Sequence, residues 1–212
     1  MADQRFSAAF AIDLASSRLR RGVVGVSYSA FALAGYVLIN GRAASDLHLM
    51  TGLDAAIPFW PSSLWVYLSF YVALVYAAFM AEEQAFLRLL RAATLVLIVA
   101  WTSFLAFPTP IVRPDPGVLA SPFWRWAFTI LHGADLPANT FPSLHVAGSV
   151  MVARAMGGSV WMGWAAAVGI STLTTKQHYV ADVAGGALLA LLAWWWMSGR
   201  PMTGRDAVGS PR

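Results

Sequence analysis

The sequence predicts an all-α membrane protein built as a bundle of six transmembrane helices. Of its 212 residues, 58% are hydrophobic and only 11% are charged, whereas charged residues make up about 25% of a typical soluble domain. The apolar residues come in long runs that short polar stretches separate. Because a helix needs about 20 mostly apolar residues to cross a bilayer, a chain of this length has room for several spans in a single membrane domain.

Six apolar stretches are the predicted spans. Each has a composition that fits a helix, and each is bounded by proline, glycine or a charged residue. They cover residues 22–39, 64–80, 92–107, 143–156, 159–173 and 179–197, of which the fourth and the fifth are short for a full crossing. We therefore predict one membrane domain over residues 1–198, followed by a flexible cytoplasmic tail, 199–212, rich in glycine, proline, serine and arginine.

The basic residues predict the orientation, because Lys and Arg concentrate in cytoplasmic loops. With the N-terminus inside, ten of the fourteen fall on the inner side: Arg5, Arg18, Arg20, Arg21, Arg88, Arg91, Arg154, Arg200, Arg205 and Arg212. The outer side receives Arg42, Arg113, Arg125 and Lys176. We expect a plasma membrane, such as a bacterial inner membrane, with both termini cytoplasmic and the loops 41–63, 108–140 and 174–177 on the extracytoplasmic face.

Charge and cysteine content exclude two classes of function. A net charge of +4 could fit nucleic acid, but the arginines stand at the ends of apolar runs and do not form a basic, aromatic-rich surface. The membrane, and not nucleic acid, is therefore the expected partner. The chain has no cysteine, which excludes disulfides and thiolate catalysis.

His178 and Asp182 are the first candidate catalytic residues. Residues four apart share one face of a helix, so the carboxylate can accept a hydrogen bond from one imidazole nitrogen. The other nitrogen is then oriented and more basic, which suits a nucleophile or a general base. A purely structural pair that ties helices together remains the alternative.

The sequence Phe-Pro-Ser-Leu-His at residues 141–145 is the second candidate. His145 follows Pro142 at the start of an apolar run, which is typical of a first helical turn. The free backbone N–H groups there, including that of Leu144, and the Ser143 hydroxyl would form a phosphate site. Alternatively, Ser143 only caps the helix and His145 faces water.

Two cations complete the candidate site. Arg113 lies in a proline-punctuated loop, and its planar guanidinium matches phosphate oxygens. Lys176, the only lysine, stands two residues before His178. Both could instead be ordinary interfacial charges. Taken together, the two histidines, the carboxylate, the helix start and the cations indicate phosphoryl transfer in which one imidazole attacks phosphorus and the other protonates the leaving oxygen.

The residues 141–145, followed by His178-Tyr179-Val180-Ala181-Asp182 and set among six apolar spans, resemble the type 2 phosphatidic acid phosphatase (PAP2) superfamily of membrane enzymes. The resemblance implies active-site segments at 107–114, 139–145 and 171–182. It further implies a phosphohistidine on His178, oriented by Asp182, with His145 as the acid. It also implies lipid phosphate substrates at the outer face and no metal cofactor.

Three positions depart from the phosphatase pattern: Leu144 stands in place of glycine, Ala106 in place of lysine, and Thr172 in place of arginine. With fewer cations, the chain is more similar to the branch of inositol phosphorylceramide synthases and sphingomyelin synthases. That branch moves a phospho-headgroup between lipids, and a diester carries less charge to neutralise. We expect a lipid phosphatase or a phospho-headgroup transferase with an alcohol acceptor.

Two alternatives belong to other classes. His145, His178 and Asp182 could bind zinc in a membrane hydrolase, although Asp182 would then no longer orient His178. A small transporter or lipid-binding protein could line a pathway with the same residues, but transporters place ionisable groups nearer the middle of their spans. The outer loop 41–63 is expected to anchor the chain at the interface, and residues 121–131 are expected to form a short interfacial helix.

Overall fold

The computed structural model describes residues 17–40 and 47–199. This part of the chain is helical and contains no β-strand. Its helices are α2 (Arg18–Asn40), α3 (Gly52–Ala56), η1 (Pro61–Ser63), α4 (Leu64–Met80), α5 (Glu83–Ala106), η2 (Pro116–Val118), α6 (Pro122–Ala134), α7 (Leu144–Met156), α8 (Ser159–Thr174) and α9 (Val180–Ser198). The predicted tail lies outside the described residues from position 200 on. The all-α class is confirmed.

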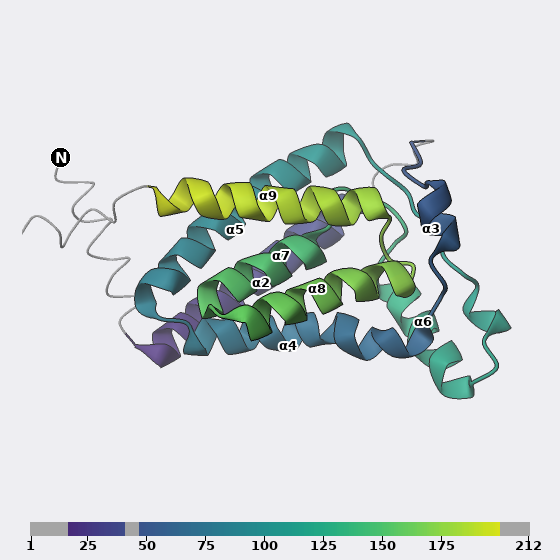
Figure 1. The fold of residues 1–212 in the computed structure, drawn as a ribbon, viewed down its shortest axis with the longest axis horizontal. Coiled ribbons are helices and arrows are strands. Elements are labelled where there is room, and N and C mark those ends of the chain that lie inside the picture. The colour runs from purple at the N-terminus through teal and green to yellow at the C-terminus, as the bar shows by residue number, and fades with distance from the viewer. Residues whose placement is uncertain (1–16, 41–46, 200–212) are drawn as a thin grey trace, which may run out of the picture.

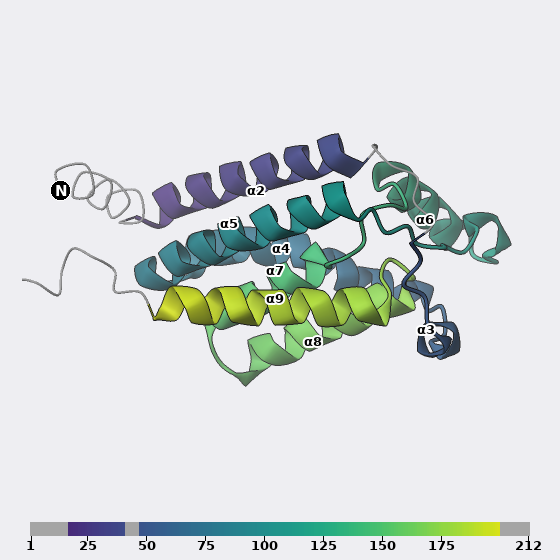
Figure 2. The ribbon, with the colours of Figure 1, turned by 90° about the horizontal axis from the view of Figure 1, so that it is seen from above.

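Six long helices of the described part of the chain, α2, α4, α5, α7, α8 and α9, lie side by side and alternate in direction (Figures 1 and 2). The starts of α2, α5 and α8 lie at one end of the bundle with the ends of α4, α7 and α9; we call it the basic end. The opposite end carries α3, α6 and the turn between α8 and α9; we call it the loop end. Each of the six predicted apolar stretches therefore forms a helix.

Among the described residues, four helical segments are long and apolar enough to cross a membrane: Arg18–Asn40, Pro61–Met80, Glu83–Ala106 and Val180–Ser198. The other two helices are shorter. At 1.5 Å per residue, the 13 residues of α7 extend about 20 Å and the 16 residues of α8 about 24 Å, against a hydrocarbon thickness of about 30 Å. Membrane association thus follows from four helices.

The predicted boundary of the third span is corrected by nine residues, since α5 begins at Glu83 and not at position 92. Glu82 has extended backbone geometry and ends the preceding connection, and Glu83 occupies the first turn. Hydrophobicity locates the part of a helix that lies among apolar groups, but the backbone hydrogen bonds continue through the charged first turns. Arg88 shows how such a turn packs, because its guanidinium lies over the Trp194 ring of α9 at 5.6 Å.

The central helix is α7. Every residue from Val146 to Ala153 is buried, because α4, α5, α8 and α9 all pack against it. A helix that is apolar on all sides is stable only in such a position. Gly148 lets the Phe70 ring of α4 come close, since a Cβ at this glycine would lie 2.6 Å from that ring. In Figure 1, α7 starts deeper inside the bundle than α4 and α8, which both extend farther toward the loop end.

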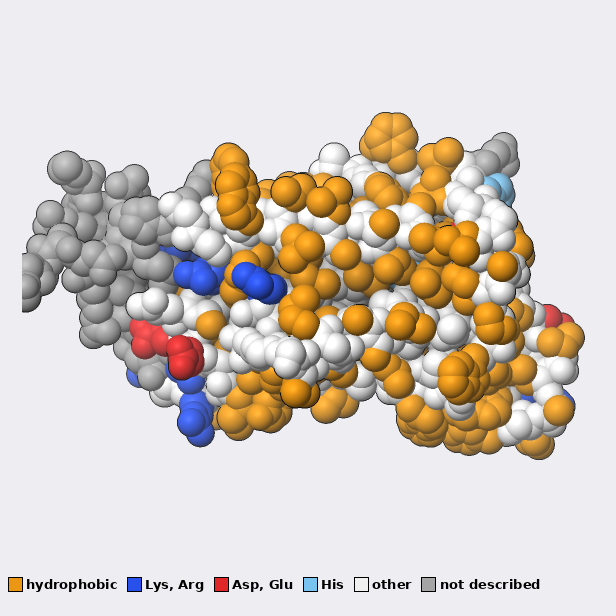
Figure 3. Space-filling view, viewed as in Figure 1, with side chains coloured by type: hydrophobic (Ala, Val, Ile, Leu, Met, Phe, Trp, Pro, Cys, Tyr) orange, Lys and Arg blue, Asp and Glu red, His pale blue; other side chains and the backbone are white. Residues whose placement is uncertain are grey.

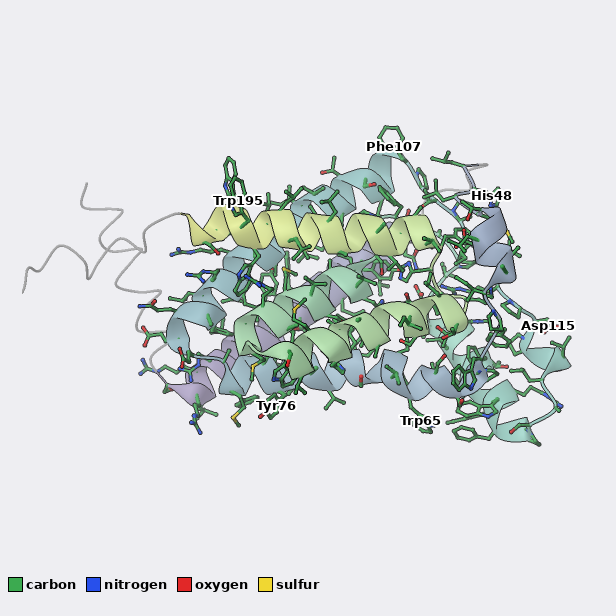
Figure 4. All side chains as sticks on the ribbon, viewed as in Figure 1. His48, Trp65, Tyr76, Phe107, Asp115 and Trp195 are labelled. Carbon is green, nitrogen blue, oxygen red and sulfur yellow. The ribbon has the colours of Figure 1, made fainter. Side chains whose placement is uncertain are left out.

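The outer surface of the bundle is apolar between its two ends. Figure 3 shows hydrophobic side chains over the middle of one face. Exposed aromatic side chains project at both ends of the bundle, with Trp195 toward the basic end and Trp65 and Phe107 toward the loop end (Figure 4). Aromatic residues in these positions are typical of the two membrane interfaces. The surface therefore fits a lipid environment.

The described basic residues separate between the two ends. The basic end carries Arg18, Arg20, Arg21, Arg88, Arg91 and Arg154, and the loop end carries Arg113, Arg125 and Lys176. The remaining residues of the charge argument, Arg5, Arg42, Arg200, Arg205 and Arg212, lie outside the described residues. The separation agrees with the sorting expected from sequence, and the side on which each end lies stays a prediction.

The loop end has more structure than expected. The helix expected over residues 121–131 forms as α6, whose Phe128 is fully buried against Leu64 and Tyr67 of α4. The connection between α2 and α4 also contains α3, which Thr51 and Asp54 cap by reciprocal hydrogen bonds. Both helices cover the end of the bundle where the polar motifs lie.

Candidate functional site

His178 and Asp182 meet where the turn after α8 enters α9. His178 lies two residues before α9, not on a helix as the spacing suggested, and Asp182 lies in the first turn of α9. His178 Nδ1 is 3.4 Å from Asp182 Oδ2, but the two atoms are not aligned for a hydrogen bond, and Nδ1 has no hydrogen-bond partner among the described residues. The side chains are in contact, and catalytic hydrogen bonds are often loose before substrate binds.

The carboxylate of Asp182 is fully buried and holds the start of α9. Its Oδ2 accepts the Tyr179 N–H at 2.8 Å, which fixes the residue after His178. The turn before it is held by Thr172, whose carbonyl accepts the N–H groups of Gln177 at 2.9 Å and of His178 at 3.2 Å. Backbone contacts on both sides therefore hold His178 in place.

His145 lies in the first turn of α7, surrounded by aromatic residues of α4. Its ring stacks on Tyr67 at 4.3 Å between centroids and lies 4.9 Å from Phe70. Its Nε2 is 3.1 Å from Tyr71 Oη. The expectation that His145 either serves the site or faces water is thus refined: the ring is enclosed on one side by α4 and is directed toward His178.

The two histidines come together as predicted, with ring centroids 6.0 Å apart. The segments that carry them are joined directly, because the N–H of Ser143 donates to the Asp182 carbonyl at 3.1 Å. Gly186, one turn after Asp182 on α9, allows this contact, since a Cβ there would collide with the Ser143 carbonyl oxygen. Two segments more than 30 residues apart therefore form one site at the loop end.

Ser143 is buried, and its Oγ accepts the Val146 N–H at 3.3 Å. The hydroxyl is thus used as a helix cap, which was the structural alternative stated above. The N–H groups of Leu144 and His145 make no hydrogen bond with any described residue. These two backbone donors, more than the hydroxyl, are available to an anion at the helix start.

Arg113 is bound to another residue of the chain. Its guanidinium donates to both the carboxylate and the backbone carbonyl of Asp135, and the carboxylate lies 2.8 Å away. Asp135 also accepts from Tyr36 Oη at 2.6 Å and from Asn40 Nδ2 at 3.2 Å, both at the end of α2. Asp135 was missed because it stands 22 residues from Arg113 with no spacing signal. Arg113 lies near the site, but its charge is already paired.

Lys176 is also engaged, since its ammonium donates to the carbonyls of Asp54 at 2.8 Å and Ile57 at 2.5 Å. Asp54 in turn accepts the Val180 N–H at 2.7 Å, so α3 is tied to both sides of His178. Burial of Asp54 opposes ionisation, but hydrogen bonds from Thr51 and Val180 and the charge of Lys176 outweigh it and lower the pKa of Asp54. Asp54 was assigned only to an anchoring loop.

A pocket of about 360 Å³ opens beside His178 at the loop end. Apolar side chains form most of its wall: Met50, Ala55, Ile57, Ile111, Val112, Pro114 and Leu173. The charged residues on the wall, Asp54, Arg113 and Lys176, all have partners within the chain. A ligand in this pocket therefore meets apolar groups and the imidazole of His178.

His132 lies at the edge of this region, with Nε2 3.4 Å from Gln177 Nε2. Its pKa is lowered by partial burial and then by the charge of Arg113, against the opposing effect of Asp135. A neutral His132 can accept from the Gln177 amide, and Gln177 is itself fully buried beside His178. The residue supports the turn from outside and does not reach the two central histidines.

The zinc alternative has no support from side-chain positions. Within residues 17–40 and 47–199, no three His, Cys, Asp or Glu side chains gather closely enough to hold a metal ion. His145 points one ring nitrogen at Tyr71, and Asp182 faces the Tyr179 N–H. The three residues are thus arranged as a chain of contacts and do not converge on one point.

Comparison with known proteins gives no assignment. No protein-family model matches the chain, and neither a curated protein nor a solved structure matches it. The resemblance carried by residues 141–145 and 178–182 therefore stays a prediction, as do the activities that it implies.

Proposed function

We propose that the chain is an integral membrane enzyme that transfers a phosphoryl group from a lipid phosphate ester through a phosphohistidine on His178. The observation that carries the proposal is the meeting of His178, Asp182 and His145 at one end of an apolar bundle, from segments far apart in sequence. A structural role alone would not require two imidazoles 6.0 Å apart, one of which, His178, lines an open pocket. This assignment would make the chain a member of the PAP2 superfamily.

In the proposed mechanism, His178 attacks with Nε2, since Nδ1 faces Asp182. The lone pair of Nε2 forms the new bond to phosphorus as the bond to the leaving oxygen breaks. Asp182 stabilises the imidazolium that results, and His145 gives a proton to the leaving oxygen. The Leu144 and His145 N–H groups stabilise the equatorial oxygens. Water or an alcohol then attacks phosphorus from the opposite side and releases His178.

The engaged cations favour transfer over hydrolysis of a monoester. A phosphate monoester brings up to two negative charges into the site, and Arg113 and Lys176 are both paired within the chain. A phosphodiester brings only one negative charge. Since burying unpaired charge is costly, a lipid phosphodiester donor and an alcohol acceptor suit the pocket better.

We further propose that all six long helices cross the membrane with both termini cytoplasmic. The separation of basic residues between the two ends supports this orientation, because the larger group lies at the basic end. The loop end, with the two histidines, then faces the extracytoplasmic side. Helices α7 and α8 are short, and α7 is enclosed along Val146 to Ala153 by the helices around it.

The experiment is mass spectrometry of lipids after incubation with the purified protein, using a panel of lipid phosphate mono- and diesters with and without an alcohol acceptor. A new phosphodiester identifies a transferase, and free phosphate identifies a phosphatase. His178→Ala is expected to abolish either product, and an acid-labile phosphoryl label is expected on the wild-type protein. His48→Ala is the matched control, because His48 is exposed at the same end (Figure 4). Equal activity of the two variants would refute the proposal.

A further inference from the structure

Tyr71 makes the hydrogen bond with the His145 ring. The residues Tyr67, Phe70 and Tyr71 are spaced three and four apart on α4, so they share the face turned toward the start of α7. The rings of Tyr67 and Phe70 contact the His145 ring, with centroids 4.3 and 4.9 Å from its own. Tyr71 stands edge-on at 5.5 Å and brings its hydroxyl to 3.1 Å from Nε2. No other hydrogen bond to this imidazole is found among the described residues.

We propose that Tyr71 is a positioning residue that holds Nε2 of His145 and so makes Nδ1 the nitrogen that exchanges a proton with the reacting oxygen. The proposal rests on the proposed function of His145 as the acid. It adds a residue that neither the spacing of the motifs nor their composition indicated, because Tyr71 belongs to a helix 74 positions earlier in the chain.

The proton balance assigns the hydrogen bond its direction. A His145 ring that is ready to act as an acid carries protons on both nitrogens, so Nε2–H must donate and Tyr71 Oη must accept. Nδ1–H passes its proton to the leaving oxygen as that oxygen takes the electron pair of the broken bond to phosphorus. The neutral ring keeps its proton on Nε2, which still donates its hydrogen bond to Tyr71 Oη. Nδ1 is then the base that takes the proton of the attacking alcohol or water, and the ring returns to its starting state.

The three aromatic rings have a different role from the hydroxyl. Burial opposes a positive charge on His145, and the faces of Tyr67 and Phe70 offset part of this cost through cation–π attraction. They do not select one nitrogen over the other. Only the hydroxyl of Tyr71 distinguishes Nε2 from Nδ1, so removing that single oxygen should disturb the tautomer and leave the packing in place.

Tyr71→Phe tests the proposal with Tyr76→Phe as its control. The two tyrosines lie on the same helix and are equally exposed, at 45% and 47%, but Tyr76 stacks on Trp161 and makes no contact with His145. Each variant is given two donors with the same phosphoryl headgroup, one with an alkyl alcohol as leaving group and one with nitrophenol. The alkoxide needs an acid and the nitrophenolate does not.

We expect Tyr71→Phe to lower kcat on the alkyl donor about tenfold or more, a part of the 10² to 10⁴ typical of a general acid, and to change kcat on the nitrophenyl donor less than twofold. Tyr76→Phe should change neither. Equal effects of Tyr71→Phe on both donors, or no effect on either, would overturn the role of Tyr71. Retained activity of His178→Ala on the same donors would instead overturn the proposed function.

A second measurement does not depend on turnover. Nitrogen NMR of the protein labelled in its four histidines, with His145→Gln to assign the signal, reports which ring nitrogen carries the proton. At a pH high enough to leave the His145 ring neutral, the wild-type protein and Tyr76→Phe are expected to hold it in the Nε2–H form, and Tyr71→Phe is expected to give a mixture of the two tautomers. An unchanged His145 signal in Tyr71→Phe would contradict the proposal.

Discussion

The guanidinium of Arg113 has a side chain only 7% exposed, so its partner decides what it does. The sequence suggested that Arg113 binds phosphate. In the structure its guanidinium is paired with the carboxylate of Asp135, which also accepts hydrogen bonds from Tyr36 and Asn40 of α2. A buried cation that is paired with a carboxylate contributes mainly by avoiding an unpaired charge. At the scale of the residue, Arg113 therefore fastens α2 to the loop that leads to the site.

Asp135→Asn is expected to lower the free energy of unfolding by about 2 kcal/mol or more, because it leaves the charge of Arg113 buried without a counter-charge. Denaturant titration in detergent micelles measures the change. Asp115→Asn is the control, since Asp115 is exposed in the same loop and accepts only the Gly117 N–H; losing this cap should cost about 1 kcal/mol or less. A similar decrease in the free energy of unfolding in both variants would show that the ion pair with Arg113 contributes no more to stability than the Asp115 cap does.

How far sequence could predict the site depends on where each contact comes from. His178 and Asp182 are four apart, and Ser143 and His145 follow Pro142, so local spacing was enough to identify them. Asp135, Asp54 and Tyr71 meet their partners across more than 20, 120 and 70 positions. Nothing local in the chain carries that information, because these contacts exist only once the helices pack.

At the scale of the elements, hydrophobic runs located all six long helices but not their ends. The run that begins at position 92 is the apolar part of α5, and the helix itself starts at Glu83. Composition also could not distinguish α7 from the lipid-facing helices, since a helix surrounded by protein and one surrounded by lipid are both apolar on all sides. Its burial from Val146 to Ala153 follows from its place at the centre.

Gly186 determines how closely α9 approaches the start of α7. An alanine there would place its Cβ against the Ser143 carbonyl, a backbone atom that cannot rotate away, so Gly186→Ala is expected to push Asp182 and Ser143 apart and to lower both the melting temperature and kcat. Overpacking of this kind typically costs about 1–3 kcal/mol. Gly163→Ala in α8 is the control, since a Cβ at Gly163 would meet nothing within 4 Å, and it should leave both unchanged. Equal behaviour of the two variants would contradict the close approach.

The docking of α3 is expected to depend on pH through Asp54. Because its pKa lies below the ordinary 3.8, the ionised carboxylate stabilises the fold above that value, and this contribution is lost as the pH falls through the lower, folded pKa. The difference in melting temperature between wild type and Asp54→Asn should therefore be largest at pH 6 and should narrow toward pH 3. A difference that stays constant over this range would exclude the carboxylate as its source.

At the scale of the whole molecule, the arrangement of the ends links the fold to the proposed chemistry. The two histidine segments, the pocket, α3 and α6 all lie at the loop end, and most described basic residues lie at the opposite end. If the long helices all cross, this arrangement puts chemistry on one face of the membrane and the positive charge on the other. Helices α7 and α8 test this arrangement most directly. Their lengths of about 20 and 24 Å are shorter than the hydrocarbon core of a bilayer, about 30 Å.

Single cysteines distinguish six crossings from four, because the chain has no cysteine of its own. Three exposed positions are informative: Ala120 at the loop end, Ser198 at the end of α9, and Ser159 at the start of α8. With a membrane-impermeant maleimide, we expect Ala120→Cys to be labelled on intact cells, and Ser198→Cys and Ser159→Cys to be labelled only after the membrane is permeabilised. The unchanged chain is the control and should take up no label.

Two other labelling patterns would each indicate a different membrane topology. If α7 and α8 form a hairpin that enters the bilayer without crossing it, the thiol at position 159 lies among lipid chains and stays unlabelled in both conditions, while Ser198→Cys still responds to permeabilisation. Labelling of Ser198→Cys on intact cells would reverse the orientation and place His178 on the cytoplasmic face. Substrates would then have to come from the inner leaflet, so the same three thiols also determine which lipids the site can reach.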